Sequence, residues 1–402
     1  MKKIAIVIVM FLVLPKLSAQ GISFEHSTFK EVLAKAKAEK KMVFMDCFTT
    51  WCGPCKMMAK DIFPQPKVGE YMSANFVSIK MDMEKGEGIE LAKTYNVNAY
   101  PTLLFMDAEG KVVHRATGAE KAEDFIEQGK IAFDPTKQLD HLEKQYQSGN
   151  RDLAFLAQYV KALYTAYNLE AIAKVGKDVF PTMKPEQYLT EDGFTVIAHA
   201  GVDYKSKIYN YLIKNKKAFI DKPYIGKESY EYVIGSAISN YLTEIATKKT
   251  LPELDKAITE TEKDYVSPQQ SQYKTYYYGQ HYLAQKQYDK WFDFNKKQAD
   301  EAFAKNQKEA LSTYINTAYS VAVNPDLDKA GLEQKAITMI ESVKGADPES
   351  LAVNFCLASL YLKTANKEKG LENINAYIKK STDKGDEPNA RVLSLKTKIE
   401  SL

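Results

Sequence analysis

The stretch that decides the fold is Trp51-Cys52-Gly53-Pro54-Cys55-Lys56. Two cysteines two residues apart can open and close a disulfide within one helical turn. The apolar run Met42–Met45 precedes them and predicts a buried strand. Gly53 and Pro54 suit the first turn of a helix, where no amide donor is needed. The stretch therefore predicts a helix that begins at the cysteine pair, directly after a strand.

This placement makes the two sulfurs unequal. Cys52 is expected at the helix N-terminus, where free N–H groups and the helix dipole stabilise a thiolate. Cys55 lies one turn further in and is expected to be more buried and less acidic. One sulfur is thus suited to attack a disulfide and the other to resolve the product.

The composition is that of a soluble protein with more than one domain. The chain has 402 residues, of which 45% are hydrophobic and 27% charged. The formal net charge is +3, and Lys2, Lys3 and Lys16 in the first 19 residues account for that excess. The remainder is neutral, which offers no electrostatic reason for binding nucleic acid or a membrane surface.

Residues 1–19 have the pattern of a secretory signal peptide. Met1–Lys3 is the charged start, Ile4–Leu14 is apolar, Pro15 follows, and Leu17-Ser18-Ala19 offers a cleavage site. The alternative is a membrane anchor, but Ile4–Leu14 is too short to cross about 30 Å of hydrocarbon. No later stretch is long and apolar enough to span a bilayer. We expect export, to a periplasm or to the outside of the cell.

The cysteines favour redox chemistry over a disulfide-stapled or metal-binding fold. Besides the pair there are only Cys47 and Cys356, few for a stapled protein of this length. Both are expected to be inert buried thiols, with a bridge between them as the alternative. The histidines show no ligand spacing, so a zinc site lacks two ligands. No metal or other cofactor is expected.

Residues 22–133 alternate between strand and helix periods, which predicts an α/β fold. Asp107–Gly110 is a turn that makes the last two strands a hairpin, so an antiparallel edge is expected on a parallel sheet. The predicted strands are Val43–Phe48, Phe76–Met81, Thr102–Met106 and Lys111–Arg115; the predicted helices are Phe29–Ala36, Gly53–Ile62, Val68–Met72, Ile89–Tyr95 and Ala119–Ile131.

Asp134-Pro135-Thr136 ends this pattern, and helical periods follow. An all-α domain is therefore expected over 135–402, after a signal peptide at 1–19 and an α/β domain at 20–134. The predicted helices are Leu153–Tyr167, Leu169–Phe180, Glu228–Ala246, Gln270–Gln285, Lys290–Phe303, Leu311–Val323, Gln334–Val343, Ser350–Lys363 and Glu368–Lys379.

Two helix–turn–helix stretches share one spacing of small and aromatic residues. Gly279 and Tyr282 precede Gln287–Trp291, and Ala358 and Tyr361 precede Asn366–Gly370. Both stretches resemble tetratricopeptide repeats, in which antiparallel helices stack into a solenoid. An irregular helical bundle is the alternative.

Residues 22–133 resemble a thioredoxin-fold domain. The matching pieces, in the family's order, are Asp46, the stretch Trp51–Lys56, Lys80, Tyr100-Pro101-Thr102 and Gly118. The interruption at Pro64 and Pro66 is more similar to the thioredoxin-like modules of exported thiol–disulfide interchange proteins. The resemblance implies a redox disulfide between Cys52 and Cys55.

The resemblance also implies roles for the catalytic residues. Cys52 would attack a partner disulfide, and Cys55 would then attack Cys52 and release the partner. Asp46 would be a buried carboxyl that relays the resolving proton, and Lys80 would pair with it. A purely structural ion pair is the alternative for Asp46 and Lys80. Pro101 would be cis and would expose the backbone before it to an extended substrate strand.

Client binding is implied around the same motif. Trp51, Gly53, Pro54, Tyr100 and Gly118 are the candidate substrate-binding residues, although Trp51 is also explained by packing alone.

Two functions remain. The first is an exported thiol–disulfide oxidoreductase that reduces or isomerises protein disulfides, with the helical domain holding the client. Its partners would be disulfide-containing proteins and an upstream electron donor. The alternative is a helical binding or scaffold protein with an accessory redox-sensing module.

Overall fold

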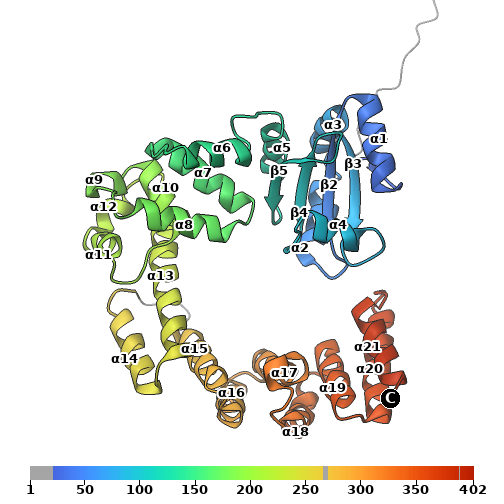
Figure 1. The fold of residues 1–402 in the computed structure, drawn as a ribbon. Helices are drawn as coiled ribbons and strands as arrows, with labels where there is room; N and C mark the ends of the chain where they lie inside the picture. Colours follow the sequence, from blue (N-terminus) through green and yellow to red (C-terminus); the bar gives the residue numbers. More distant parts are fainter. Residues whose placement is uncertain (1–20, 266–269, 389) are drawn as a thin grey trace, which may run out of the picture. The chain divides into compact units, whose positions relative to one another are not determined.

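The computed structural model describes residues 21–265, 270–388 and 390–402 (Figure 1). The predicted signal peptide at 1–19 lies outside these residues. The chain divides into two compact units. The first holds the residues up to Arg151 together with Lys161–Leu169, and the second holds Asp152–Val160 and Glu170–Leu402. The expected domain boundary after residue 134 stays a prediction.

The first unit contains a five-stranded mixed sheet in the order β1-β3-β2-β4-β5. Strands β1, β3 and β2 are parallel, whereas β4 is antiparallel to both β2 and β5. The expected hairpin edge is confirmed; the two-residue β1 was missed because it is too short to show a period. The strands are β1 (Phe24–Glu25), β2 (Met42–Phe48), β3 (Phe76–Asp82), β4 (Thr102–Met106) and β5 (Val112–Thr117).

Helices cover both faces of this sheet. Because side chains alternate along β2, they pack in two cores, one on each face. Val43, Met45 and Cys47 pack in one core with α1 (Phe29–Glu39) and α4 (Gly88–Thr94). Phe44 packs in the other core, with α3 (Pro66–Asn75) and α5 (Ala122–Ile131). Thr28 caps the start of helix α1 and forms a capping box with Glu31. A strand buried on both faces explains why β2 is apolar along nearly its whole length.

The helix that carries the cysteine pair is not the single α-helix predicted for Gly53–Ile62. Helix α2 (Gly53–Met57) continues into a π-helical turn, η1 (Met58–Ile62). The amide of Phe63 accordingly donates to Met58 O, five residues back, at 2.9 Å. Met58, Ile62 and Phe63 are all buried in the same core. The extra residue per turn brings these three side chains to one face.

The rest of the chain is helical, as expected, and no strand follows Thr117 in the described residues. Helix α6 (Leu139–Gln147) lies in the first unit, and α7 (Leu153–Thr165) contributes to both. The remaining helices are α8 (Leu169–Val179), α9 (Pro185–Tyr188), α10 (Glu191–Ala200), α11 (Lys207–Lys214), α12 (Lys216–Ile220), α13 (Gly226–Lys248), α14 (Leu251–Thr261), α15 (Gln270–Ala284), α16 (Tyr288–Phe303), α17 (Gln307–Val323), α18 (Glu333–Val343), α19 (Leu351–Lys363), α20 (Lys367–Asp383) and α21 (Ala390–Glu400), with 3-10 turns η2 (Pro325–Leu327) and η3 (Lys344–Ala346).

Both predicted helix–turn–helix stretches form, as α15–α16 and α19–α20. They share one turn: Lys286 and Ala365 are left-handed at φ 54° and 52°. The next amides donate back to Tyr282 O at 2.8 Å and to Tyr361 O at 2.9 Å. The α7–α8 turn repeats this geometry at Tyr167, with φ 57°. These turns fit stacked helical hairpins; the tetratricopeptide assignment itself stays a prediction.

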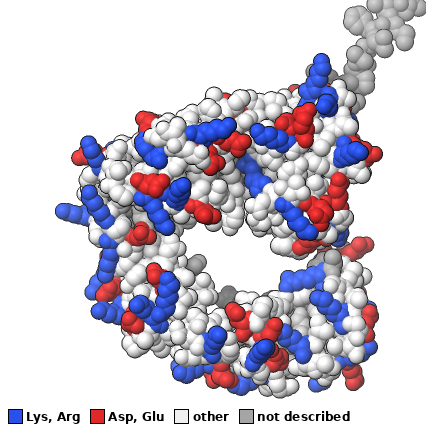
Figure 2. Space-filling model, viewed as in Figure 1, with Lys and Arg blue, Asp and Glu red and all other residues white. Residues whose placement is uncertain are grey.

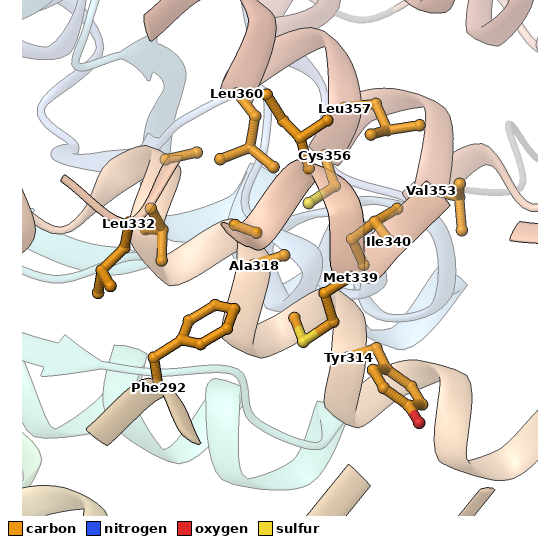
Figure 3. Packing of buried hydrophobic residues seen from close by; sticks show 14 of the residues in the cluster. Phe292, Tyr314, Ala318, Leu332, Met339, Ile340, Val353, Cys356, Leu357 and Leu360 are labelled. Carbon is orange, nitrogen blue, oxygen red and sulfur yellow. The ribbon is translucent and has the colours of Figure 1, made fainter. Parts of the chain in front are cut away.

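One apolar core holds α16, α17, α18 and α19 of the second unit together, and a separate core packs α20 and α21 against α19. Figure 3 shows Cys356 among Ile340, Leu357 and Leu360, with Ala318 of α17 nearby. Burial raises the pKa of the Cys356 thiol to about 12. Its expected role as an inert apolar side chain agrees with this environment.

Charged residues of both signs are interspersed on the visible face (Figure 2). This pattern agrees with a neutral body. Within the described ranges, no helix combines the length and apolarity needed to cross a bilayer.

Candidate active site

The two cysteines of the opening motif form a disulfide at the start of α2. Cys52 is the N-cap residue, and its Sγ accepts the Cys55 amide at 3.1 Å. Pro54 stands in the first turn, where its missing N–H removes no helical hydrogen bond. The structure therefore places Cys52 among the unpaired amides of a helix N-terminus, as predicted. The same amides and the helix dipole would stabilise its thiolate once the bond is reduced.

The expected difference in burial between the two sulfurs is not present in this oxidised form. Cys52 and Cys55 are each 3% exposed. The bond holds the Cys52 sulfur against the buried Cys55 sulfur, so both are shielded alike. The expected difference in burial is therefore wrong for this structure, and the expected difference in acidity stays a prediction.

Asp46 lies on β2, the strand that leads to the disulfide, and is completely buried. The parallel register aligns it with Lys80 of β3, whose Nζ lies 3.3 Å from Asp46 Oδ2. Apart from this ion pair with Lys80, neither carboxyl oxygen has a hydrogen-bond partner among the described residues. Burial raises the pKa of Asp46 to about 6, and the nearby ammonium only partly offsets this. Asp46 can therefore exchange a proton near neutral pH.

Lys80 is positioned by aromatic rings as well as by Asp46. Its Nζ lies 4.9 Å from the ring centre of Phe48, 5.6 Å from that of Phe24 and 5.5 Å from that of Phe63. The 3.3 Å distance between Lys80 Nζ and Asp46 Oδ2 is the predicted pairing of these two residues.

The loop before β4 brings a second backbone segment to the site. The Tyr100–Pro101 peptide bond is cis, as predicted. Pro101 O accepts the amide of Gly118 at 2.9 Å, and Thr102 Oγ1 donates to Ala99 O at 2.8 Å. Gly118 has φ 101°, a conformation that L side chains rarely adopt, which accounts for glycine there.

Trp51 stands at the surface beside the disulfide. It is 56% exposed, so core packing does not explain it. Its ring is edge-on to Tyr100 at 6.0 Å, and its Nε1 donates to both carboxylate oxygens of Glu84 at 3.0 Å. Sequence reasoning missed Glu84, because a charged residue in a loop gives no local sign of its partner.

A buried polar chain behind the site was also missed. Gln128 Nε2 donates to Glu120 Oε1 at 2.9 Å, and Gln128 Oε1 accepts from His114 Nε2 at 2.7 Å. Burial raises the pKa of Glu120 to about 7 and lowers that of His114. The Glu120 amide donates to Met58 Sδ at 3.3 Å, so the chain borders the active-site helix. Glu120 follows a glycine turn, where sequence alone suggests a solvated carboxylate.

Cys47 belongs to the core on the far side of β2 from Asp46. Burial raises the pKa of the Cys47 thiol well above its usual value. Cys47 and Cys356 are both free and buried, each in the core of its own unit. The described part of the chain contains no group of three potential metal ligands.

Comparisons with known proteins cover the first quarter of the chain. The thioredoxin-like domain family matches residues 29–130. A thioredoxin-like protein of Synechocystis is 34% identical over 27% of this chain and 94% of its own length. Thioredoxin Y of Oryza sativa, a chloroplast protein, is 34% identical over 30% of this chain and 67% of its own length.

Two further similarities are to larger or structurally characterised proteins. The thiol:disulfide interchange protein DsbD of Vibrio cholerae is 35% identical over 25% of this chain, but the match spans only 17% of DsbD. A solved structure titled a putative disulphide-isomerase from Bacteroides thetaiotaomicron is 50% identical, over 29% of this chain and 96% of that one, with a TM-score of 0.27.

The match to nearly the full length of a relative coincides with the domain that carries the Cys52–Cys55 disulfide. The chain therefore belongs to the thioredoxin-like family and, through this cysteine pair, is a thiol–disulfide oxidoreductase.

Proposed function

We propose that the protein is an exported reductant or isomerase of protein disulfides whose helical region binds the client. The observation that carries the proposal is the disulfide at the N-terminus of α2, together with the buried, titratable Asp46 on the strand that leads to it. A dithiol in this arrangement can give two electrons to a client disulfide, after which an electron donor must reduce the protein disulfide again.

The exchange begins with the reduced pair. The Cys52 thiolate attacks one sulfur of a client disulfide, and the other client sulfur leaves as a thiolate that takes up a proton. A mixed disulfide now joins Cys52 to the client. Cys55 then loses its proton and attacks Cys52 Sγ, which releases the second client thiolate and restores the disulfide of the structure. Two electrons pass from the protein dithiol to the client.

Asp46 is proposed to accept the proton that Cys55 must lose. A pKa of about 6 leaves most of the carboxyl ionised at neutral pH, yet close enough in acidity to return the proton. Lys80, on the partly exposed side of the pair, would stabilise the ionised form.

Trp51, Gly53, Pro54, Tyr100 and Gly118 are proposed to contact the client. Trp51 is exposed beside the disulfide, and its ring meets that of Tyr100. An extended client segment could pair with backbone in the loop before Pro101.

Export and direction are part of the proposal. The charged and apolar pattern of residues 1–19 supports export to a periplasm or beyond the cell. The Gly-Pro pair between the cysteines is the thioredoxin-like pair and favours a reductant. A reductant outside the cytoplasm needs an upstream electron donor to reduce Cys52–Cys55 after each turnover.

The test is covalent trapping combined with reduction of insulin. Cys55→Ser should leave Cys52 joined to clients as mixed disulfides that a non-reducing gel separates. Cys52→Ser should trap nothing and should abolish insulin reduction by an added dithiol. Equal insulin reduction by wild type and Cys52→Ser would instead favour the scaffold protein with a sensing module.

A further inference from the structure

A polar pocket of about 380 Å³ lies in the first unit beside the loop that carries the cis proline. Ala99 and Thr102, which flank Tyr100–Pro101, both line it. Trp51 contacts Tyr100 from the side of the disulfide. The pocket therefore lies directly beside the backbone that is proposed to pair with an extended client segment.

The other wall comes from the helices that follow the α/β domain. Leu139 begins α6, and Ala166, Tyr167 and Asn168 form the turn after α7. These residues belong to the same compact unit as the sheet. Tyr167 is 55% exposed, with the left-handed backbone of a hairpin turn. The pocket thus exists only because the first helical hairpin completes it.

The pocket carries one charged side chain, Arg115 of β5. Its guanidinium donates to Asn96 O at 3.0 Å and to Tyr95 O, which holds it in place and leaves other N–H groups available. No carboxylate among the described residues acts on its charge, and none of the lining residues is acidic. Burial lowers the pKa of Arg115, and only the smaller effect of the Cys47 sulfur opposes this.

The neighbours of Arg115 add neutral polar groups: Asn96, Asn98, Thr102, Thr117 and Asn168. Asn98 Nδ2 donates to Asn96 Oδ1 at 2.9 Å on the exposed rim. A partly desolvated cation without an anion, surrounded by amides and hydroxyls, is complementary to a carboxylate.

We propose that this pocket binds an acidic side chain of the client, next to the disulfide that Cys52 attacks. The inference rests on the proposed function and adds a specificity determinant to it. Binding the carboxylate would hold the client segment along the cis-proline loop and so raise the rate of attack. It would also give the first helical hairpin a direct part in choosing clients.

The experiment uses the full-length protein, reduced beforehand, so that no electron donor is needed. Its substrates are disulfide-linked peptides that differ only in Glu, Gln or Lys, scanned along both sides of the cysteine. Second-order rate constants for thiol oxidation come from acid quench and mass spectrometry. Each is divided by the same protein's rate with 2-hydroxyethyl disulfide, so that changes in thiol chemistry cancel.

At one scanned position, the normalised rate constant of the wild type should be about tenfold higher for the Glu peptide than for the Lys peptide. A ratio of this size is expected for a charge-assisted contact. Asn98→Asp on the domain wall and Tyr167→Glu on the helical wall should each reduce that ratio to about one or below. Tyr232→Glu is the matched control, because Tyr232 is 61% exposed on α13 and does not line the pocket. Asn168→Asp also adds a negative charge to the helical wall, with almost no change in the shape of the side chain, and should lower the Glu-to-Lys ratio in the same way.

Failure of this inference is separable from failure of the proposed function. The inference is overturned if wild type shows no preference at any position, or if Tyr167→Glu and Asn168→Asp behave like Tyr232→Glu. The proposed function fails instead if the reduced protein oxidises with the small disulfide but not with any peptide.

Discussion

At the scale of single residues, burial controls the chemistry. Asp46, Cys47 and Cys356 are all titratable groups inside apolar cores, and burial raises the pKa of each. The ammonium of Lys80 keeps the pKa of Asp46 within reach of neutral pH. The charge of Arg115 acts on Cys47 but does not offset its burial, so the pKa of Cys47 stays well above its usual value. Both buried thiols therefore stay protonated. Environment, more than residue type, thus separates the reactive groups from the inert ones.

Asp46→Asn should stabilise the folded protein at neutral pH. The carboxyl has a pKa of about 6 when folded and 3.8 ordinarily, so its ionisation above pH 6 penalises the folded state. The penalty is at most about 3 kcal/mol. We expect Asp46→Asn to raise the free energy of unfolding by about 1–3 kcal/mol at pH 7.5, measured in urea. Below about pH 3, well under the ordinary pKa of 3.8, the carboxyl is protonated in both states and the gain should vanish.

Exposed Asp61 provides the control, since Asp61→Asn removes a carboxylate from the surface and should not reproduce the stabilisation of Asp46→Asn. The same Asp46→Asn variant should also accumulate the mixed disulfide, because Cys55 loses its proton acceptor. Loss of stability at pH 7.5 would contradict the assignment of Asp46 as a costly buried charge.

Alkylation should separate the four cysteines. In the reduced native protein at pH 7, iodoacetamide should modify Cys52 first, because its thiolate is stabilised at the N-terminus of α2. Cys47 and Cys356 should react only after unfolding, since both are buried with raised pKa values. Peptide mapping over time measures the order. A rate at Cys52 no higher than that of an ordinary free thiol would contradict the proposed nucleophile.

At the scale of elements, helix ends set the geometry. The N-terminus of α2 holds the disulfide, and η1 widens the helix to keep its apolar residues in the core. In the helical region the repeated feature is a left-handed turn residue after α7, α15 and α19. None of these three turn residues is glycine. The spacing of small and aromatic residues therefore predicted two of the hairpins, whereas the turns themselves carried no local signal.

Ala365→Gly and Lys286→Gly should stabilise the second unit. Both residues are exposed and have positive φ, a conformation that favours glycine. We expect each change to raise the free energy of unfolding of that unit by about 0.5–1 kcal/mol. Ala376→Gly, inside α20, should lower it by about 1 kcal/mol. Circular dichroism during urea unfolding measures all three, and a loss of stability in both turn variants would refute the turn assignment.

At the scale of the whole molecule, the chain consists of two compact units with separate cores. Only the first contains the redox pair. Reduction should therefore change the stability of one unit and leave the other as it was. Independent cores also mean that unfolding of the full chain is not a two-state process.

Calorimetry of the full chain should show two transitions, one of which responds to dithiothreitol. Closing the short loop between Cys52 and Cys55 stabilises its unit by about 2 kcal/mol in the chain-entropy account. Reduction should lower the midpoint of that transition by several degrees. Cys52→Ser should already show the lower midpoint and no response to the reductant. A single transition that shifts as a whole would mean that the units unfold together.

The sequence by itself determined the chemistry and most of the local structure. Trp51–Lys56 after an apolar strand identified the redox helix, and helical periods identified α13, α19 and α20, because motif and periodicity are local properties. Only the tertiary structure decided which distant groups meet. The pair of Asp46 with Lys80 was expected from the family resemblance, but the contact of Glu84 with Trp51 and the pocket that holds Arg115 and Tyr167 were not. These contacts depend on chain segments packed together in space, which no local pattern records.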